Sequence, residues 1–130
     1  VLLVTFSHYK PLDRKVIKQL VEDWYLSESI KILKTRTNEF AKKMKVQPSG
    51  MTIKNYISKW GSCTAHNKIS YNWRIIMAPD YIIDYLVIHE LSHIIEPNHS
   101  NNFWQHVGNY CEDFQTKRKW LRENGHKLVL

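Results

Sequence analysis

Apolar residues recur every three or four positions between Pro11 and Met44. The recurring positions are Ile17, Leu20, Val21, Trp24, Leu26, Ile30, Leu33, Phe40 and Met44. This spacing is that of one helix face, and neither glycine nor proline interrupts it. The pattern therefore predicts one long amphipathic helix, or two helices in series, ending before the turn residues Pro48-Ser49-Gly50.

Two segments that follow have the character of strands. Residues 51–59 are rich in β-branched and aromatic side chains. Between Lys68 and Met77 apolar and polar residues alternate almost perfectly, which is typical of a half-buried strand. We expect these two segments to pair with each other as a hairpin.

The most apolar helix is predicted from about Pro79 to Ile95. Pro79 suits a first helical turn, and the negative charges of Asp80 and Asp84 lie near the positive end of the helix dipole. Apolar residues occupy most of its circumference, which a helix tolerates only when protein surrounds it. We therefore expect this helix to be central and buried.

Two shorter helices are expected to close the chain. Pro97 forces a turn after the buried helix, and Asn98 or Ser100 can cap the helix that follows. That helix takes its core face from Phe103, Trp104, Val107 and Tyr110. The last helix is predicted near residues 113–123 and ends at Asn124-Gly125.

Composition favours one domain with its own core. The 130 residues include 43% hydrophobic side chains, and no repeat or long linker divides them. The cysteines Cys63 and Cys111 lie far apart, which argues against a disulfide framework and favours a reducing, cytoplasmic setting. No run is long and apolar enough to cross a membrane. Because the sequence opens at Val1, we expect residues 1–130 to be one domain from the C-terminal part of a longer chain.

The formal charge of +7 raises the chance of a nucleotide or nucleic-acid partner. Most of the surplus lies in two groups, Lys31, Lys34, Arg36, Lys42, Lys43 and Lys45, and then Lys117, Arg118, Lys119 and Arg122. The apolar residues between them keep helical spacing, so a solvated helix face explains both groups without a ligand.

The predicted buried helix carries an HExxH arrangement, His89-Glu90-Leu91-Ser92-His93. Residues four apart share a helix face, so His89 and His93 can bind one metal ion. Glu90 projects beside that face, where it can act on a water molecule without being a ligand. His99 follows the proline turn and is predicted to supply a third ligand, which leaves one position of a tetrahedral zinc ion open.

These residues predict one zinc ion per chain and metal-assisted hydrolysis with Glu90 as the general base. One Glu and two His on an apolar buried helix are costly without partners, and a metal ion accounts for all three. The competing explanation is a chance motif whose histidines are ordinary core or surface residues.

Further motifs resemble the YgjP-like metallopeptidase domain family, which is related to SprT-like and small gluzincin-like zinc proteins. They are Trp60-Gly61-Ser62-Cys63, the segment Ile69 to Pro79, Ile83-Asp84-Tyr85, His89 to His93, Asn98-His99-Ser100, Phe103-Trp104, and Trp120-Leu121 to Gly125-His126. The resemblance implies a zincin-like α+β fold, with a long N-terminal helix, a small β-sheet packed on a buried active-site helix, and two C-terminal helices. It also implies that His89, His93 and His99 bind zinc and that Glu90 is catalytic.

The spacing from His93 to His99 equals that of the metzincins. Metzincins have glycine where Glu96 stands, and no Met-turn is recognisable, so we reject that membership. Our hypothesis is that Pro97 and Asn98 make the turn that directs His99 to the other two histidines.

Other functional residues are less well determined. Gly61 can let the backbone approach the site closely, although a turn with a packed Trp60 fits equally well. Cys63 is expected to be a small buried hydrophobe. The candidates for stabilising the transition state are Asn72, Arg74, Asn98, His66 and Tyr85, and those for orienting the imidazoles are Asp84, Glu96, Glu112 and Asp113.

Three functions compete. A metallopeptidase acts on a peptide or protein, whose extended chain pairs with the edge of the sheet that contains residues 68–77. A hydrolase of nucleotides or other phosphorylated molecules would use the basic charge. A non-catalytic, zinc-stabilised binding domain needs no general base, so Glu90→Gln would leave it intact. The sequence favours the metallopeptidase.

Overall fold

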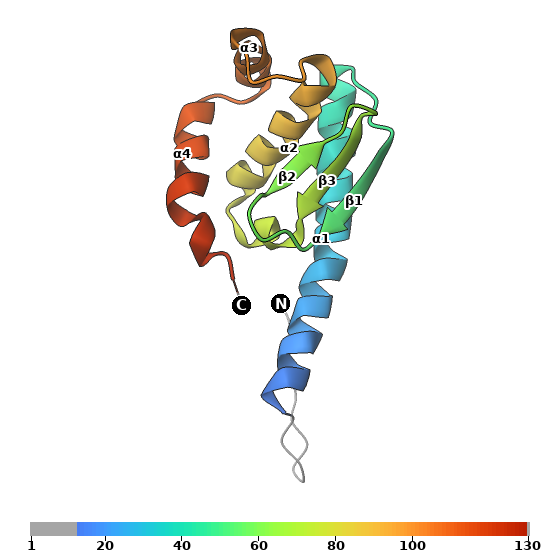
Figure 1. The fold of residues 1–130 in the computed structure, drawn as a ribbon, viewed down its shortest axis with the longest axis vertical. Coiled ribbons are helices and arrows are strands. Elements are labelled where there is room, and N and C mark those ends of the chain that lie inside the picture. Colours follow the sequence, from blue (N-terminus) through green and yellow to red (C-terminus); the bar gives the residue numbers. More distant parts are fainter. Residues whose placement is uncertain (1–12, 130) are drawn as a thin grey trace.

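The long N-terminal helix is a single element. The structure, a computed structural model, describes residues 13–129, and α1 runs through Arg14–Met44 (Figure 1). The Asp13 side chain caps its start by accepting a hydrogen bond from the Lys15 amide at 2.9 Å. Lys45 ends it in the left-handed conformation, with φ at 56°. One helix is therefore present instead of two in series, while Pro11 lies outside the described residues.

The two halves of α1 differ in burial. Its buried residues are Ser29, Leu33, Thr37, Ala41 and Met44, all in the C-terminal half. The N-terminal half projects beyond the sheet in Figure 1, and Leu20 and Leu26 there are 48% and 39% exposed. The predicted apolar face is thus correct in period, but only its second half packs on the core.

The sheet has three strands and mixed pairing. Its strands are β1 (Gly50–Lys54), β2 (Gly61–Cys63) and β3 (Lys68–Asn72), in the order β1-β3-β2. β1 lies parallel to β3, and β2 lies antiparallel to β3. The predicted hairpin between residues 51–59 and 68–77 is therefore wrong. The short strand β2, in the segment for which a turn with a packed Trp60 was one prediction, is the hairpin partner of β3.

The predicted strand over 68–77 is also too long. Residues Trp73–Met77 form the 3₁₀ helix η1 instead. The Asn72 side chain accepts a hydrogen bond from the Arg74 amide at 3.1 Å, which caps this helix. Trp73 and Ile75 stay buried in either geometry, so the alternation of apolar residues could not reveal the change of element.

Helix α2 (Asp80–Ile95) is the central helix, as predicted. Nine of its residues are buried, namely Ile82, Ile83, Tyr85, Leu86, Val87, Ile88, Glu90, Leu91 and Ser92. Pro79 lies at the N-cap position, one residue before the first turn. One face of the sheet covers the helices, with Tyr71 of β3 fully buried and its hydroxyl 2.9 Å from Thr37 Oγ1 of α1.

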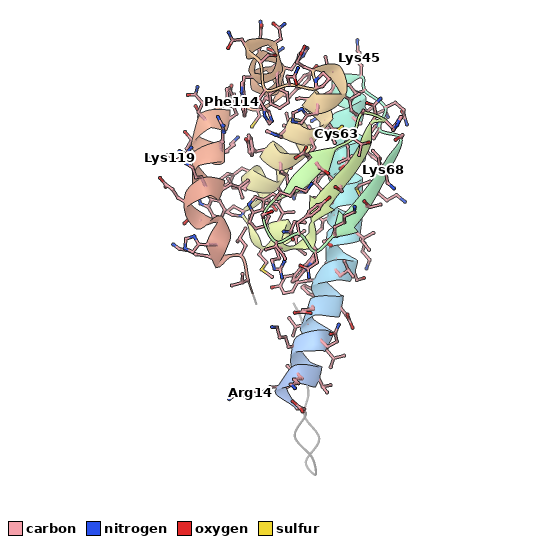
Figure 2. The ribbon with its side chains drawn as sticks, in the orientation of Figure 1. Arg14, Lys45, Cys63, Lys68, Phe114 and Lys119 are labelled. Carbon is pink, nitrogen blue, oxygen red and sulfur yellow. The ribbon has the colours of Figure 1, made fainter. Side chains whose placement is uncertain are left out.

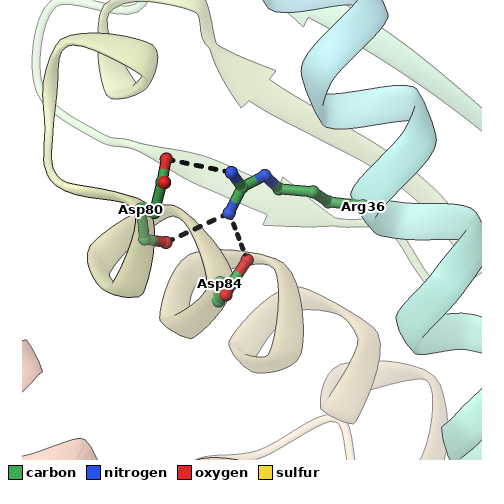
Figure 3. Close-up of polar contacts among 3 residues, drawn as sticks. All are labelled: Arg36, Asp80 and Asp84. Atoms are coloured by element: carbon green, nitrogen blue, oxygen red, sulfur yellow. Dashed lines mark hydrogen bonds and ion pairs between the residues drawn. The ribbon is translucent and has the colours of Figure 1, made fainter.

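Ion pairs join the start of α2 to α1. Arg36 bonds the carboxylates of Asp80 and Asp84 at 2.9 Å and 2.5 Å, and the Asp80 carbonyl at 3.2 Å (Figure 3). Part of the basic charge that the sequence assigned to a solvated face is therefore neutralised. These contacts join the middle of α1 to the N-terminal part of α2.

Two helices close the chain, as predicted. They are α3 (Asn101–Tyr110), capped by the Ser100 hydroxyl, and α4 (Phe114–Asn124), followed by the 3₁₀ helix η2 (Gly125–Lys127). Phe114 begins α4, and Lys119 points outward from it (Figure 2). The α+β fold is thus confirmed. In the part of the chain that the structure describes, no helix is long and apolar enough to span a membrane.

Candidate metal centre

Three histidine side chains meet above the C-terminal half of α2. The Nε2 atoms of His93 and His99 are 3.0 Å apart, and those of His99 and His89 are 3.3 Å apart. One ligand atom from each residue lies within 4.8 Å of the other two. The structure thus brings together the three residues that the sequence singled out, and His99 turns toward the pair as the turn hypothesis requires.

Aromatic side chains of α3 hold these rings in position. The Phe103 ring stacks on His93 with centroids 4.3 Å apart, and the Trp104 ring stacks on His99 at 5.8 Å. From periodicity, Phe103 and Trp104 were predicted to lie on the core face of a helix, and the pair is also one of the motifs that resemble the YgjP-like family. Phe103 and Trp104 are adjacent in the sequence, and nothing in that arrangement predicted that both rings would line the histidine cluster.

Hydrogen bonds at the opposite ring atoms orient two of the imidazoles. His93 Nδ1 donates to the Glu96 carbonyl at 3.2 Å, and His89 Nδ1 lies 3.4 Å from the Tyr85 hydroxyl. A histidine that carries its proton on Nδ1 presents the lone pair of Nε2 to a metal ion. Glu96 was a candidate for orienting an imidazole, but it acts through its carbonyl rather than its carboxylate. Tyr85 was a candidate only for stabilising the transition state, and its contact with His89 was not predicted.

The electrostatics of the cluster favour neutral imidazoles. Burial, reinforced by the two neighbouring histidines and Arg118, lowers the pKa of His89 to about 3. Burial also lowers the pKa of His93, against the opposing effect of the Glu96 carbonyl. Metal ions bind the neutral form of histidine, so the ring environment suits a ligand.

The geometry fits a zinc ion. Tetrahedral zinc with Zn–N bonds of about 2.0–2.1 Å separates its nitrogen ligands by about 3.3 Å. The two Nε2 separations of 3.0 Å and 3.3 Å are close to that value. Three histidine ligands would leave one position of a tetrahedral zinc ion available for a water molecule or a substrate.

Glu90 is buried beside this cluster, with an exposed fraction of 4%. Its carboxylate makes no hydrogen bond to any residue within 13–129. Burial raises its pKa to about 8, and the positive charge of Lys59 works in the opposite direction. A carboxyl group with a pKa near neutrality can both accept and return a proton.

Gly61 of β2 provides the space for Glu90. A Cβ atom at Gly61 would lie 2.8 Å from Glu90 Oε2 and 3.0 Å from the Ser70 carbonyl oxygen. The close backbone approach at Gly61 is therefore real, and its partner is the carboxylate. The sequence could not identify this partner because the two residues lie on separate elements.

The remaining candidates lie in other environments. Cys63 is half-buried in β2, and burial and the Glu90 charge raise its pKa. His66 and Asn98 are exposed. Asn72 and Arg74 bond the connection between β1 and β2, and Asp84 pairs with Arg36. Arg118, which the sequence assigned to a solvated face, lies over the Trp104 ring at 4.6 Å.

Strand β2 lies at one edge of the sheet, with Gly61 next to Glu90, and among the described residues it pairs only with β3. Hydrogen bonds from the Thr64 amide to the Lys68 carbonyl and from the Asn72 amide to the Trp60 carbonyl fix its register on β3. In an antiparallel pair this register turns the N–H and C=O groups of Gly61 and Cys63 away from β3. β3 itself is central, so an added peptide must use β2 or β1.

Fold and site together place the chain in the class of metallopeptidase-type hydrolase domains. Within that class it belongs to the YgjP-like metallopeptidase domain family, which residues 5–124 match. No curated protein matches the chain.

Two solved structures share the fold. The metallopeptidase zymogen abylysin of Pyrococcus abyssi has a TM-score of 0.61 and 16% identity, over 72% of this chain and 93% of that chain. The metallopeptidase zymogen jannalysin of Methanocaldococcus jannaschii has a TM-score of 0.60 and 22% identity, over 75% of this chain and 97% of that chain. Identities this low support a common fold and nothing finer.

Proposed function

We propose that the protein is a zinc-dependent peptidase in which His89, His93 and His99 hold one zinc ion and Glu90 is the general base. The observation that carries the proposal is the convergence of three Nε2 atoms beside a buried carboxylate that has no hydrogen-bond partner in the described chain. A binding domain with a purely structural zinc has no use for that carboxylate, whose burial costs free energy.

The metal supplies Lewis acidity, which polarises a carbonyl oxygen and acidifies a water molecule. The protein supplies the proton transfers. Glu90 Oε2 faces Gly61, where it accepts a proton from the attacking water and later returns it to the leaving amine. The rings of Phe103 and Trp104 shield the imidazoles, and the Glu96 carbonyl keeps the His93 proton on Nδ1.

The substrate binds as an added strand. The outward-facing backbone groups of Gly61 and Cys63 can pair with an extended peptide, which brings a carbonyl group to the histidine cluster. β2 is an edge of the sheet that contains residues 68–77, whereas β3 itself lies between β1 and β2.

A second candidate is a hydrolase of phosphorylated molecules, and one observation favours it. Lys59, Arg74 and Arg122 line one cavity. Lys59 lies two residues before Gly61 in the sequence. Positive charge at that place suits a phosphorylated substrate as well as an anionic peptide. Hydrolysis of nucleoside triphosphates without any peptide cleavage would select this candidate.

The test is peptide hydrolysis by zinc-loaded protein and by its Glu90→Gln variant. We expect the substitution to lower kcat by about 10²-fold or more with zinc content unchanged, because it removes general-base catalysis. Glu96→Gln is the matched control, since Glu96 contributes only its carbonyl. Cleavage that survives in Glu90→Gln would refute the assignment.

A further inference from the structure

A basic cavity of about 560 Å³ is lined by Trp60, the residue that precedes Gly61 next to Glu90. It lies between the connection from β1 to β2 and the C-terminal end of α4, which face each other in Figure 1. Its polar lining includes Lys59, Arg74, Arg122, His126, Asn55 and Tyr56. The cavity is large enough for one or two amino-acid residues.

The cavity carries unneutralised positive charge. None of its lining residues is an Asp or a Glu. Within residues 13–129, Lys59, Arg74 and Arg122 form no ion pair. Arg74 instead bonds neutral groups, the Asn55 side chain and the Tyr56 carbonyl. Such a surface attracts an anion, because the two guanidinium groups and the ammonium group still have N–H groups that can donate hydrogen bonds to it.

Buried polar contacts hold the wall of the cavity in place. Asn72, 3% exposed, donates from Nδ2 to the Tyr56 carbonyl at 3.0 Å and to the Lys59 carbonyl at 3.2 Å. The Asn72 amide also donates to the Trp60 carbonyl at 2.7 Å. One buried residue thus fixes the loop that carries Lys59, so the cationic groups are organised before a ligand arrives.

The direction of β2 decides which part of a substrate reaches the cavity. A peptide that pairs antiparallel to β2, the slightly stronger arrangement, runs from the Cys63 side toward the Gly61 side. Its C-terminal residues then pass Trp60 and reach Lys59. The cleaved bond lies beside Glu90, and therefore near Gly61. Two residues of extended chain span about 7 Å, which is the step from Gly61 to Lys59, so the cavity receives the residues directly after the cleaved bond.

We propose that this cavity binds a carboxylate of the peptide substrate, either an acidic side chain or the chain's own C-terminus, within two residues after the cleaved bond. This rests on the proposed peptidase function. It adds a substrate class, anionic on the leaving side, and gives Lys59, Arg74 and Arg122 the role of specificity-determining residues.

Two measurements test the proposal, one of binding and one of cleavage. Calorimetry with zinc-loaded Glu90→Gln protein compares short peptides that end in glutamate with the same peptides ending in glutamine amide. We expect the acidic peptides to bind about tenfold more tightly or better, as charge-assisted hydrogen bonds require. Lys59→Gln together with Arg122→Gln should abolish the preference. Lys34→Gln on exposed α1 is the control and should preserve it.

The cleavage assay uses peptide pairs with Glu or Gln at each of the two positions after the cleaved bond. A lower KM for Glu that disappears in the double variant supports the proposal. Cleavage without any preference overturns it and leaves the peptidase function intact. Acid-selective binding without any cleavage would support the cavity as a carboxylate-binding site and would refute the peptidase function. Tighter binding of a nucleoside triphosphate than of every acidic peptide would overturn the peptide as ligand.

Discussion

In its first two turns α2 carries Asp80 and Asp84, both bonded to Arg36. Further along it carries Glu90, whose carboxylate has no bonded partner among the described residues. The first pair is partly exposed, and its charges are matched by an opposite charge. Glu90 is buried without a matching charge, and its pKa is raised accordingly. A matched charge orients the helix, while an unmatched, buried one marks the position where chemistry is expected.

The largest expected effect concerns the metal-free protein and its pH dependence. Below about pH 4.5 Glu90 is protonated in both the folded and the unfolded chain. Between pH 4.5 and about 8 the unfolded chain ionises while the folded chain keeps its proton. The contribution of Glu90 to the free energy of unfolding therefore falls as pH rises through this window, by at most about 1.4 kcal/mol per pH unit.

The Glu90→Gln variant isolates this contribution. Because glutamine does not ionise, the metal-free variant should gain stability relative to the wild type as pH rises from 5 to 8, as measured by urea unfolding. His89 acts in the opposite direction, since its lowered pKa makes stability rise with pH up to about 6.5 in both proteins. A difference between the two proteins that stays constant with pH would mean that the Glu90 pKa is not raised.

The next effect tests the space that Gly61 leaves for the carboxylate. Gly61→Ala places a methyl group 2.8 Å from Glu90 Oε2 and 3.0 Å from the backbone of Ser70. We expect it to cost about 1–3 kcal/mol of stability and to lower kcat by displacing the base. Gly50→Ala is the control, because its Cβ meets nothing closer than 4.0 Å. Equal behaviour of the two variants would rule out a specific role for Gly61.

The smallest effect is expected at the matched end of α2. Arg36→Ala removes both ion pairs and should lower the free energy of unfolding by only about 1 kcal/mol, because Asp80 is largely exposed. Zinc affinity and kcat should stay unchanged. Loss of zinc in this variant would show instead that the two ends of α2 are coupled.

The helices and the histidine cluster were predictable because local rules determine them. Residues four apart on a helix share a face, so His89 and His93 had to converge, and Pro97 had to end α2. Long-range pairing was not predictable. β2 contains three residues with no apolar alternation, so nothing in its sequence indicated that it would displace β1 as the hairpin partner of β3.

The same limit applies to packing. The apolar period of α1 is equally clear in both halves, yet only the half that meets the sheet is buried. The Gly61 contact with Glu90 and the cavity around Lys59 arise from separate elements of the fold. The catalytic candidates could therefore be named from the sequence, whereas their surroundings could not.

The most direct test of the metal centre is zinc content after equilibration with excess zinc and removal of the unbound metal, measured by elemental analysis. One zinc per chain is expected for the wild type and for His66→Ala, whose exposed side chain lies outside the cluster. His93→Ala should lose at least 10²-fold in zinc affinity, roughly the cost of removing one essential ligand. Well-folded wild-type protein without stoichiometric zinc, or equal zinc content in all three proteins, would contradict the account.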